Sequence, residues 1–102
     1  MEGQPENPQT YRLSYSGVVV AQIAAILEAA QVRGILGIVG DALRRMEEIL
    51  ATEPLGFGEA QFRLPGMRVL ERVGVIHPIC INYAVSEDRP IVFIKRITVL
   101  SD

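Results

Sequence analysis

The stretch LPGMRVLERVGVIHPICINYAV, residues 64–85, decides the second half of the fold, because β-type patterns dominate from here to the end of the chain. We expect short strands at 61–64 and 68–75 and longer strands at 79–85 and 91–100. The last two are joined by SEDRP, residues 86–90, which supplies no apolar anchor. A short polar connection of this kind predicts an antiparallel hairpin.

The preceding half predicts one strand and two helices. Residues 11–15 alternate between apolar and polar, as in a half-buried strand. From Val19 the apolar residues take helical spacing, and Gly34 marks the expected end of that helix. A second helix ends before Pro54. Its apolar stripe consists of Ile35, Val39, Ala42, Leu43, Met46, Ile49 and Leu50.

This order of elements, β-α-α-β-β-β in outline, predicts an α+β fold in which a helical hairpin packs on an antiparallel sheet. We expect a single domain over residues 10–102. Residues 1–9 are rich in Pro, Asn, Gln and Glu. They are expected to form a disordered N-terminal arm.

In the strands expected at 79–85 and 91–100, apolar side chains occupy odd and even positions alike. A sheet covered by helices on one face commonly has polar residues on the other. We therefore expect the second face to be covered by another subunit or by a partner peptide. The alternative is a small barrel-like curl that buries both faces within one chain.

Composition limits the classes of function. The chain has 102 residues and a net charge of −2, and its basic residues do not form the strong patch that phosphate binding needs. The single cysteine, Cys80, cannot form an internal disulfide, and no signal sequence or long apolar run is present. We expect a cytoplasmic protein that makes no membrane contact. One histidine and one cysteine do not make a zinc site, so neither a metal nor a cofactor is expected.

The runs ALRRMEEILATEPLGFGEAQFRLPG, RVLERVGVIHPICINYAV and IVFIKRITVL together resemble the RelE/ParE superfamily of bacterial toxins. The order of elements is similar over residues 10–100. The shared features are a helix ending in a leucine and a proline, a Leu-x-Gly turn, an arginine-containing strand and a strand with a tyrosine. They correspond here to Leu50, Pro54, Leu64, Gly66, Arg72 and Tyr83.

The resemblance implies catalytic residues. RelE-like members cleave messenger RNA on the ribosome, using arginines and lysines that stabilise phosphate charge and often a tyrosine or histidine. In this chain the implied catalytic set is Arg68, Arg72, His77 and Tyr83, with Arg63 as a further phosphate ligand. Guanidinium groups suit a dianionic transition state, and a histidine can act as acid or base near neutral pH.

The chain also departs from the RelE pattern. The arginine often found shortly before the strand tyrosine is missing, and the chain ends in ITVLSD without the closing basic and aromatic residues. Lys95 and Arg96 are consecutive in a strand and are expected to point to opposite faces, so they would not serve one site.

Each candidate has a structural alternative. The arginines are more typical of a solvated strand or loop face than of a catalytic site. His77 precedes Pro78 and suits a residue at a strand entry. Cys80 and Tyr83 suit core positions, with the tyrosine hydroxyl at the edge of the core.

We therefore expect a small cytoplasmic protein of toxin-like fold that acts mainly through protein association, either as a homodimer or with an antitoxin-like partner. One alternative is a ribosome-dependent endoribonuclease, which would contact RNA and the ribosome. The other is a ParE-like toxin directed at a topoisomerase.

Overall fold

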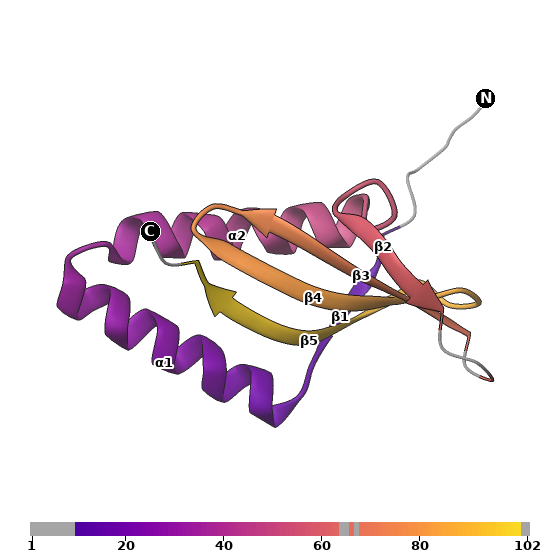
Figure 1. The fold of residues 1–102 in the computed structure, drawn as a ribbon, viewed down its shortest axis with the longest axis horizontal. Coiled ribbons are helices and arrows are strands. Elements are labelled where there is room, and N and C mark those ends of the chain that lie inside the picture. Colours follow the sequence, from indigo (N-terminus) through magenta and orange to yellow (C-terminus); the bar gives the residue numbers. More distant parts are fainter. Residues whose placement is uncertain (1–9, 64–65, 67, 101–102) are drawn as a thin grey trace.

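The computed structural model describes residues 10–63, 66 and 68–100. Within them, two helices lie against one five-stranded sheet (Figure 1). This confirms the α+β class and the helical hairpin packed on a sheet. The expected arm at residues 1–9 lies outside the described residues. The elements are β1 Arg12–Tyr15, α1 Gly17–Arg33, α2 Leu36–Thr52, β2 Glu59–Arg63, β3 Val69–Ile76, β4 Ile79–Ser86 and β5 Ile91–Val99.

The sheet is mixed and has the strand order β1-β5-β4-β3-β2. Strands β2 to β5 pair antiparallel with their neighbours, including the expected β4–β5 hairpin. β1 instead runs parallel to β5, with Arg12 opposite Ile91. The expectation of a wholly antiparallel sheet is therefore corrected at this edge. The two helices between β1 and the later strands supply the long crossover that a parallel neighbour requires.

Both helices lie where their sequence signals predict. The Ser16 side chain accepts a hydrogen bond from the Val19 backbone N–H at 3.2 Å and caps the start of α1. Gly34 ends α1 in the left-handed region, with φ of 76°. The buried residues of α2 belong to the predicted stripe and are Val39, Ala42, Met46 and Leu50.

The core lies between the helices and one face of the sheet. On β4, Ile79, Ile81 and Tyr83 are fully buried. They belong to one hydrophobic cluster with Met46 and Leu50 of α2. The alternate positions of the long strands thus supply the helix-covered face, as their spacing predicts.

An irregularity in β5 changes which of its residues share a face. The β4–β5 register shifts so that Lys95 has no partner residue of its own on β4. Ile94 lies opposite Tyr83, and Ile97 lies opposite Ile81, so both isoleucines are on the helix-covered face. The spacing of β5 predicts that its apolar residues alternate strictly between the two faces of the sheet. This expectation is wrong, because a β-bulge places two consecutive residues of β5 opposite one residue of β4. The helix-free face is therefore less apolar than predicted.

A side chain of α1 accepts a hydrogen bond from the backbone of this irregular strand. The Gln22 side-chain oxygen accepts a hydrogen bond from the Ile97 backbone N–H at 3.0 Å. β1 pairs with residues 91–94 of β5, so Ile97 lies beyond the end of β1. Gln22 thus satisfies a backbone donor on a part of β5 where β1 supplies no partner.

Candidate functional site

Two of the four predicted catalytic residues, Arg72 and Tyr83, lie together beneath the loop that follows α2. They are register partners on β3 and β4. Nε and Nη2 of Arg72 donate to the Phe57 carbonyl at 3.2 and 3.1 Å, and Nη2 also donates to the Gly58 carbonyl at 3.0 Å. The Tyr83 hydroxyl lies 2.9 Å from the Pro54 carbonyl oxygen and 2.5 Å from that of Phe57. The guanidinium that a ribonuclease would use for phosphate holds backbone carbonyls instead.

Packing fixes the same loop. The Phe57 ring stacks on Tyr83, with centroids 6.1 Å apart and 18° between the planes. It also lies over Gly74, where an added methyl group would overlap the ring. Gly58 has φ of 71°, and a Cβ there would strike the Val73 carbonyl. We name Pro54, Phe57, Gly58, Arg72 and Tyr83 the Arg72–Tyr83 clamp, since together they fasten the loop to the sheet.

The electrostatics of the clamp agree with a structural role. Burial raises the pKa of the Tyr83 phenol above its ordinary value, while the neighbouring Arg72 acts in the opposite direction. The hydroxyl is therefore neutral at physiological pH. In that state it can donate to one carbonyl at a time and accept from Arg72 Nε, which lies 3.3 Å away.

The other two predicted catalytic residues lie at opposite ends of β3. Arg68 immediately precedes this eight-residue strand, and His77 follows it in an exposed turn. A strand of that length spans about 25 Å. The structure therefore brings Arg72 and Tyr83 together in the interior, and it leaves Arg68 and His77 apart from each other.

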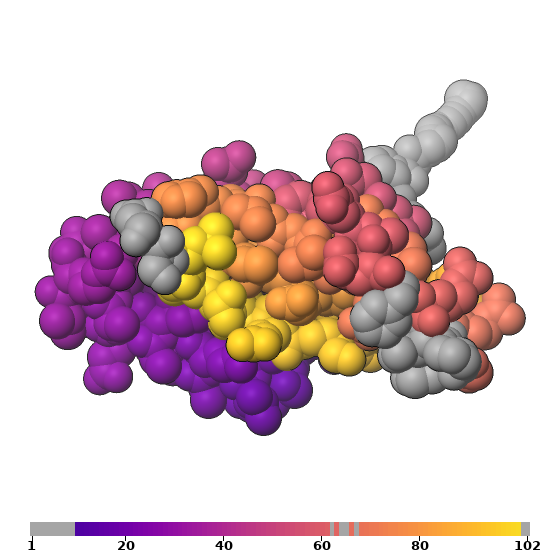
Figure 2. Space-filling view, in the orientation of Figure 1, coloured from indigo at the N-terminus to yellow at the C-terminus, as the bar shows by residue number. Residues whose placement is uncertain are grey.

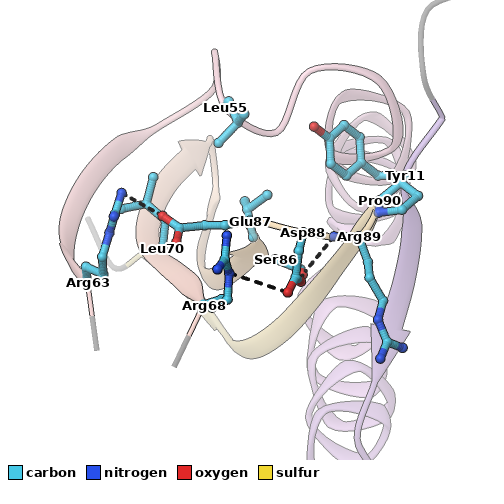
Figure 3. A pocket seen from close by; sticks show the side chains of 11 residues that line it. Tyr11, Leu55, Arg63, Arg68, Leu70, Ser86, Glu87, Asp88, Arg89 and Pro90 are labelled. Carbon is cyan, nitrogen blue, oxygen red and sulfur yellow. Dashed lines mark hydrogen bonds and ion pairs between the residues drawn. The ribbon is translucent and has the colours of Figure 1, made fainter. Parts of the chain in front are cut away.

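A cavity of about 620 Å³ lies where β1 begins, β2 ends and the β4–β5 turn meets the loop after α2 (Figure 3). Leu55, Leu70 and Val85 contribute apolar surface, and Arg68 lies on its charged side. The complete lining is Tyr11, Leu55, Arg63, Arg68, Leu70, Val85, Ser86, Glu87, Asp88, Arg89 and Pro90.

Four of the five charged residues that line this cavity form two ion pairs. Arg63 Nη2 lies 2.6 Å from Glu87 Oε2, and Arg68 Nε lies 3.5 Å from Asp88 Oδ2. The Ser86 hydroxyl donates to Asp88 Oδ1 at 3.0 Å, and this hydrogen bond stabilises the β4–β5 turn. Both ion pairs are partly exposed, and such pairs contribute about 0–1 kcal/mol.

The helix-free face of the sheet carries several charges. Arg96 lies opposite Asn82 in the β4–β5 register, and Lys95 Nζ lies 3.4 Å from Glu71 Oε2. Lys95 and Arg96 are both exposed. The expectation that they point to opposite faces is wrong, because the bulge at this point breaks the alternation. Cys80, on the same strand as Asn82, is half-buried.

α1 presents an extensive apolar surface to solvent. The exposed fractions of Val18, Val20 and Val32 are 68%, 55% and 85%. From Gly17 to Leu27 the helix has no charged residue. Figure 2 shows α1, in indigo, at the border of the molecule beside β5. We name as the outer face of α1 the surface made by Val18, Val20, Ala21, Ala24, Ala25, Ala29 and Val32, all of them exposed.

The outer face of α1 is the feature that the sequence predictions missed. The spacing of Val19, Ile23 and Ile26 identified the inner side of the helix correctly, since these residues pack in the core cluster. The available signal was the lack of any charged residue from Gly17 to Leu27. An exposed helix face normally carries charged or polar residues.

Two kinds of site are not found. Among the described residues, no group of three His, Cys, Asp or Glu side chains is placed to hold a metal ion. Neither α1 nor α2, the helices of the described part, is long and apolar enough to cross a bilayer.

Comparison with protein-family models found no match, and comparisons with curated proteins and with solved structures found no significant similarity. The resemblance to the RelE/ParE superfamily therefore stays a prediction.

Proposed function

We propose that the protein acts by binding another polypeptide, and that the outer face of α1 is its binding surface. The observation that carries this proposal is the exposure of Val18, Val20 and Val32 on a helix with no charge in its first eleven residues. A helix segment whose exposed side chains are apolar is normally covered. Burying the exposed part of each valine stabilises a complex by on the order of 1 kcal/mol.

The nature of the partner follows the sequence prediction. A second copy of the chain, or an antitoxin-like polypeptide as the RelE/ParE resemblance implies, would supply the complementary apolar surface. The expected location in the cytoplasm belongs to the same proposal. The helix-free face of the sheet, where the partner was first expected, is less suited because Glu71, Lys95 and Arg96 stand on it.

The endoribonuclease alternative has less support. It needs free guanidinium groups and an acid or base around one phosphate. Arg72 is engaged with the loop carbonyls, and His77 lies at the other end of β3 from Arg68. The topoisomerase-directed alternative requires no nuclease residues and is a special case of polypeptide binding.

Site-specific photo-crosslinking in growing cells tests the proposal. A benzophenone amino acid replaces Val32 on the outer face of α1 in one variant and Glu48 on the exposed side of α2 in a matched control. We expect irradiation to give one adduct of defined mass from position 32 and none from position 48. Mass spectrometry then identifies the attached chain.

The control separates specific contact from random capture. Equal adduct patterns from both positions would mean that the outer face of α1 has no special role, and so would the lack of any adduct from position 32. Either result would contradict the proposed function.

A further inference from the structure

We propose that the polypeptide covering α1 is a second copy of this chain, paired through α1 in an antiparallel arrangement about a two-fold axis at Ala25. This inference rests on the proposed function and names its partner. The two copies would meet along one stripe of the outer face of α1, whose residues recur at i, i+3 and i+4 spacing. The stripe consists of Val18, Ala21, Ala25, Ala29 and Val32.

The stripe is self-complementary. Its side chains read valine, alanine, alanine, alanine, valine in both directions. Val18 and Val32 are each seven residues from Ala25, and Ala21 and Ala29 are each four residues from it. A two-fold axis at Ala25 therefore places every valine against a valine and every alanine against an alanine. The small central side chains let the two helix axes approach closely, and the valines fill the space at the ends.

The helix dipoles favour the antiparallel arrangement, because it places the positive N-terminal end of each α1 beside the negative C-terminal end of its partner. α1 carries two charged residues, Glu28 and Arg33. In the antiparallel pair the two copies of Glu28 are separated by about 9 Å along the helix axis, because the axis at Ala25 maps position 28 onto position 22.

The size of the contact sets the expected affinity. α1 has 17 residues, so it is about 25 Å long and roughly 10 Å wide. That footprint is about 250 Å² per copy, against about 800 Å² per partner in a standard stable interface. Leu36 and Ile38, exposed at the start of α2, add apolar surface near the Val32 end. We expect a reversible dimer of micromolar or weaker affinity.

Sedimentation equilibrium of the purified full chain, from micromolar to sub-millimolar concentration, tests this dimer. Ala25→Glu sets two carboxylates face to face on the axis and should raise the dissociation constant by about tenfold or more. Gln31→Glu adds the same charge to an exposed position of the same helix outside the stripe and should leave the constant unchanged. Circular dichroism establishes that each variant is folded.

Cross-linking tests the position of the axis. In a Cys80→Ser background, Ala25→Cys should form an intermolecular disulfide when oxidised glutathione is added. Gln31→Cys should not form one beyond the rate of random collision. A residue on the axis faces its own copy at the short distance that a disulfide needs.

The outcomes separate this inference from the function on which it rests. The inference is overturned if the chain is monomeric at every concentration. It is also overturned if Ala25→Glu leaves the dissociation constant unchanged and cysteines at positions 25 and 31 cross-link equally. If a monomeric chain still gives a photo-adduct with a different protein from position 32, the proposed function stands and the second copy is wrong. A monomeric chain without any photo-adduct contradicts both.

Discussion

α1 and α2 have the same length of 17 residues and lie side by side in one hairpin, yet they meet solvent in opposite ways. α2 buries one apolar stripe and directs Asp41, Arg44, Arg45, Glu47 and Glu48 outward. α1 also buries a stripe, but its outer face is made of valines and alanines. From Asp41 onward the apolar side of α2 is packed within the chain, whereas we propose that a partner covers the outer face of α1.

The difference shows why a core prediction does not predict a binding surface. The inner positions of both helices satisfy the same requirement, which is contact with the sheet. The outer positions have no such requirement in α2, so charged residues are accommodated there. The lack of charge from Gly17 to Leu27 of α1 is a constraint that the isolated chain does not explain.

The largest expected effect contrasts a buried residue of α2 with an exposed residue of α1. Met46→Ala removes a side chain that is 1% exposed, and it should lower the free energy of unfolding by about 2–5 kcal/mol. Val32→Ala should change it by less than about 0.5 kcal/mol at a concentration where the chain is monomeric. Chemical denaturation measures both. Equal losses would mean that the outer face of α1 is packed within the chain.

The next effect concerns the loop after α2. Arg72→Ala removes the donors to the Phe57 and Gly58 carbonyls, so it should lower the free energy of unfolding by about 2–3 kcal/mol. Arg68→Ala breaks an exposed ion pair with Asp88 and should cost about 0.5 kcal/mol or less. Thermal unfolding of the two variants distinguishes them. A stable Arg72→Ala variant would contradict the structural role of the clamp.

A smaller effect is expected within α1 itself. Gln22→Leu removes the acceptor for the Ile97 N–H and should destabilise the chain by about 1–2 kcal/mol. Gln31→Leu, at an exposed position of the same helix, is the matched control and should have little effect. Faster amide exchange at Ile97 in the first variant alone would show that the loss is local. Unchanged exchange would refute the assigned hydrogen bond.

The smallest expected effect is a change in pH dependence. Tyr15 donates a hydrogen bond to Glu47 of α2 at 2.9 Å, and burial, together with this carboxylate, raises the pKa of the phenol. A raised pKa means that the folded chain holds the proton more tightly, so stability contributed by this group is full below pH 10 and falls as pH rises above it. Tyr15→Phe should flatten that alkaline decline in denaturation measurements. An identical slope in both proteins would contradict the assignment.

The elements that could be predicted from sequence are those fixed by local patterns. Ser16 and Gly34 mark the ends of α1, and the apolar stripe marks α2. The β4–β5 hairpin follows from two long apolar runs around a polar turn. In each case the residues that form the element lie close together in the chain, so periodicity and turn chemistry are sufficient.

The remaining features depend on contacts between distant segments. The parallel pairing of β1 with β5 and the bulge at Lys95 follow from how the strands meet, and neither has a local signal. Neither a catalytic role nor a solvated face, the two sequence expectations for Arg72, predicts its hydrogen bonds to the carbonyls of a loop 14 and 15 residues away. Of the candidate catalytic set, Arg72 and Tyr83 lie together as register partners, whereas Arg68 and His77 lie at the two ends of β3.

The most direct test of the central claim is the accessibility of α1 and α2 in cells. Cysteine is placed at Ala25 in one variant and at Glu48 in another, both in a Cys80→Ser background, and a membrane-permeant maleimide labels them. We expect position 25 to react more slowly than position 48 in intact cells, and both positions to react equally once the protein is denatured. Equal labelling of the two positions in intact cells would contradict the claim that a partner covers α1.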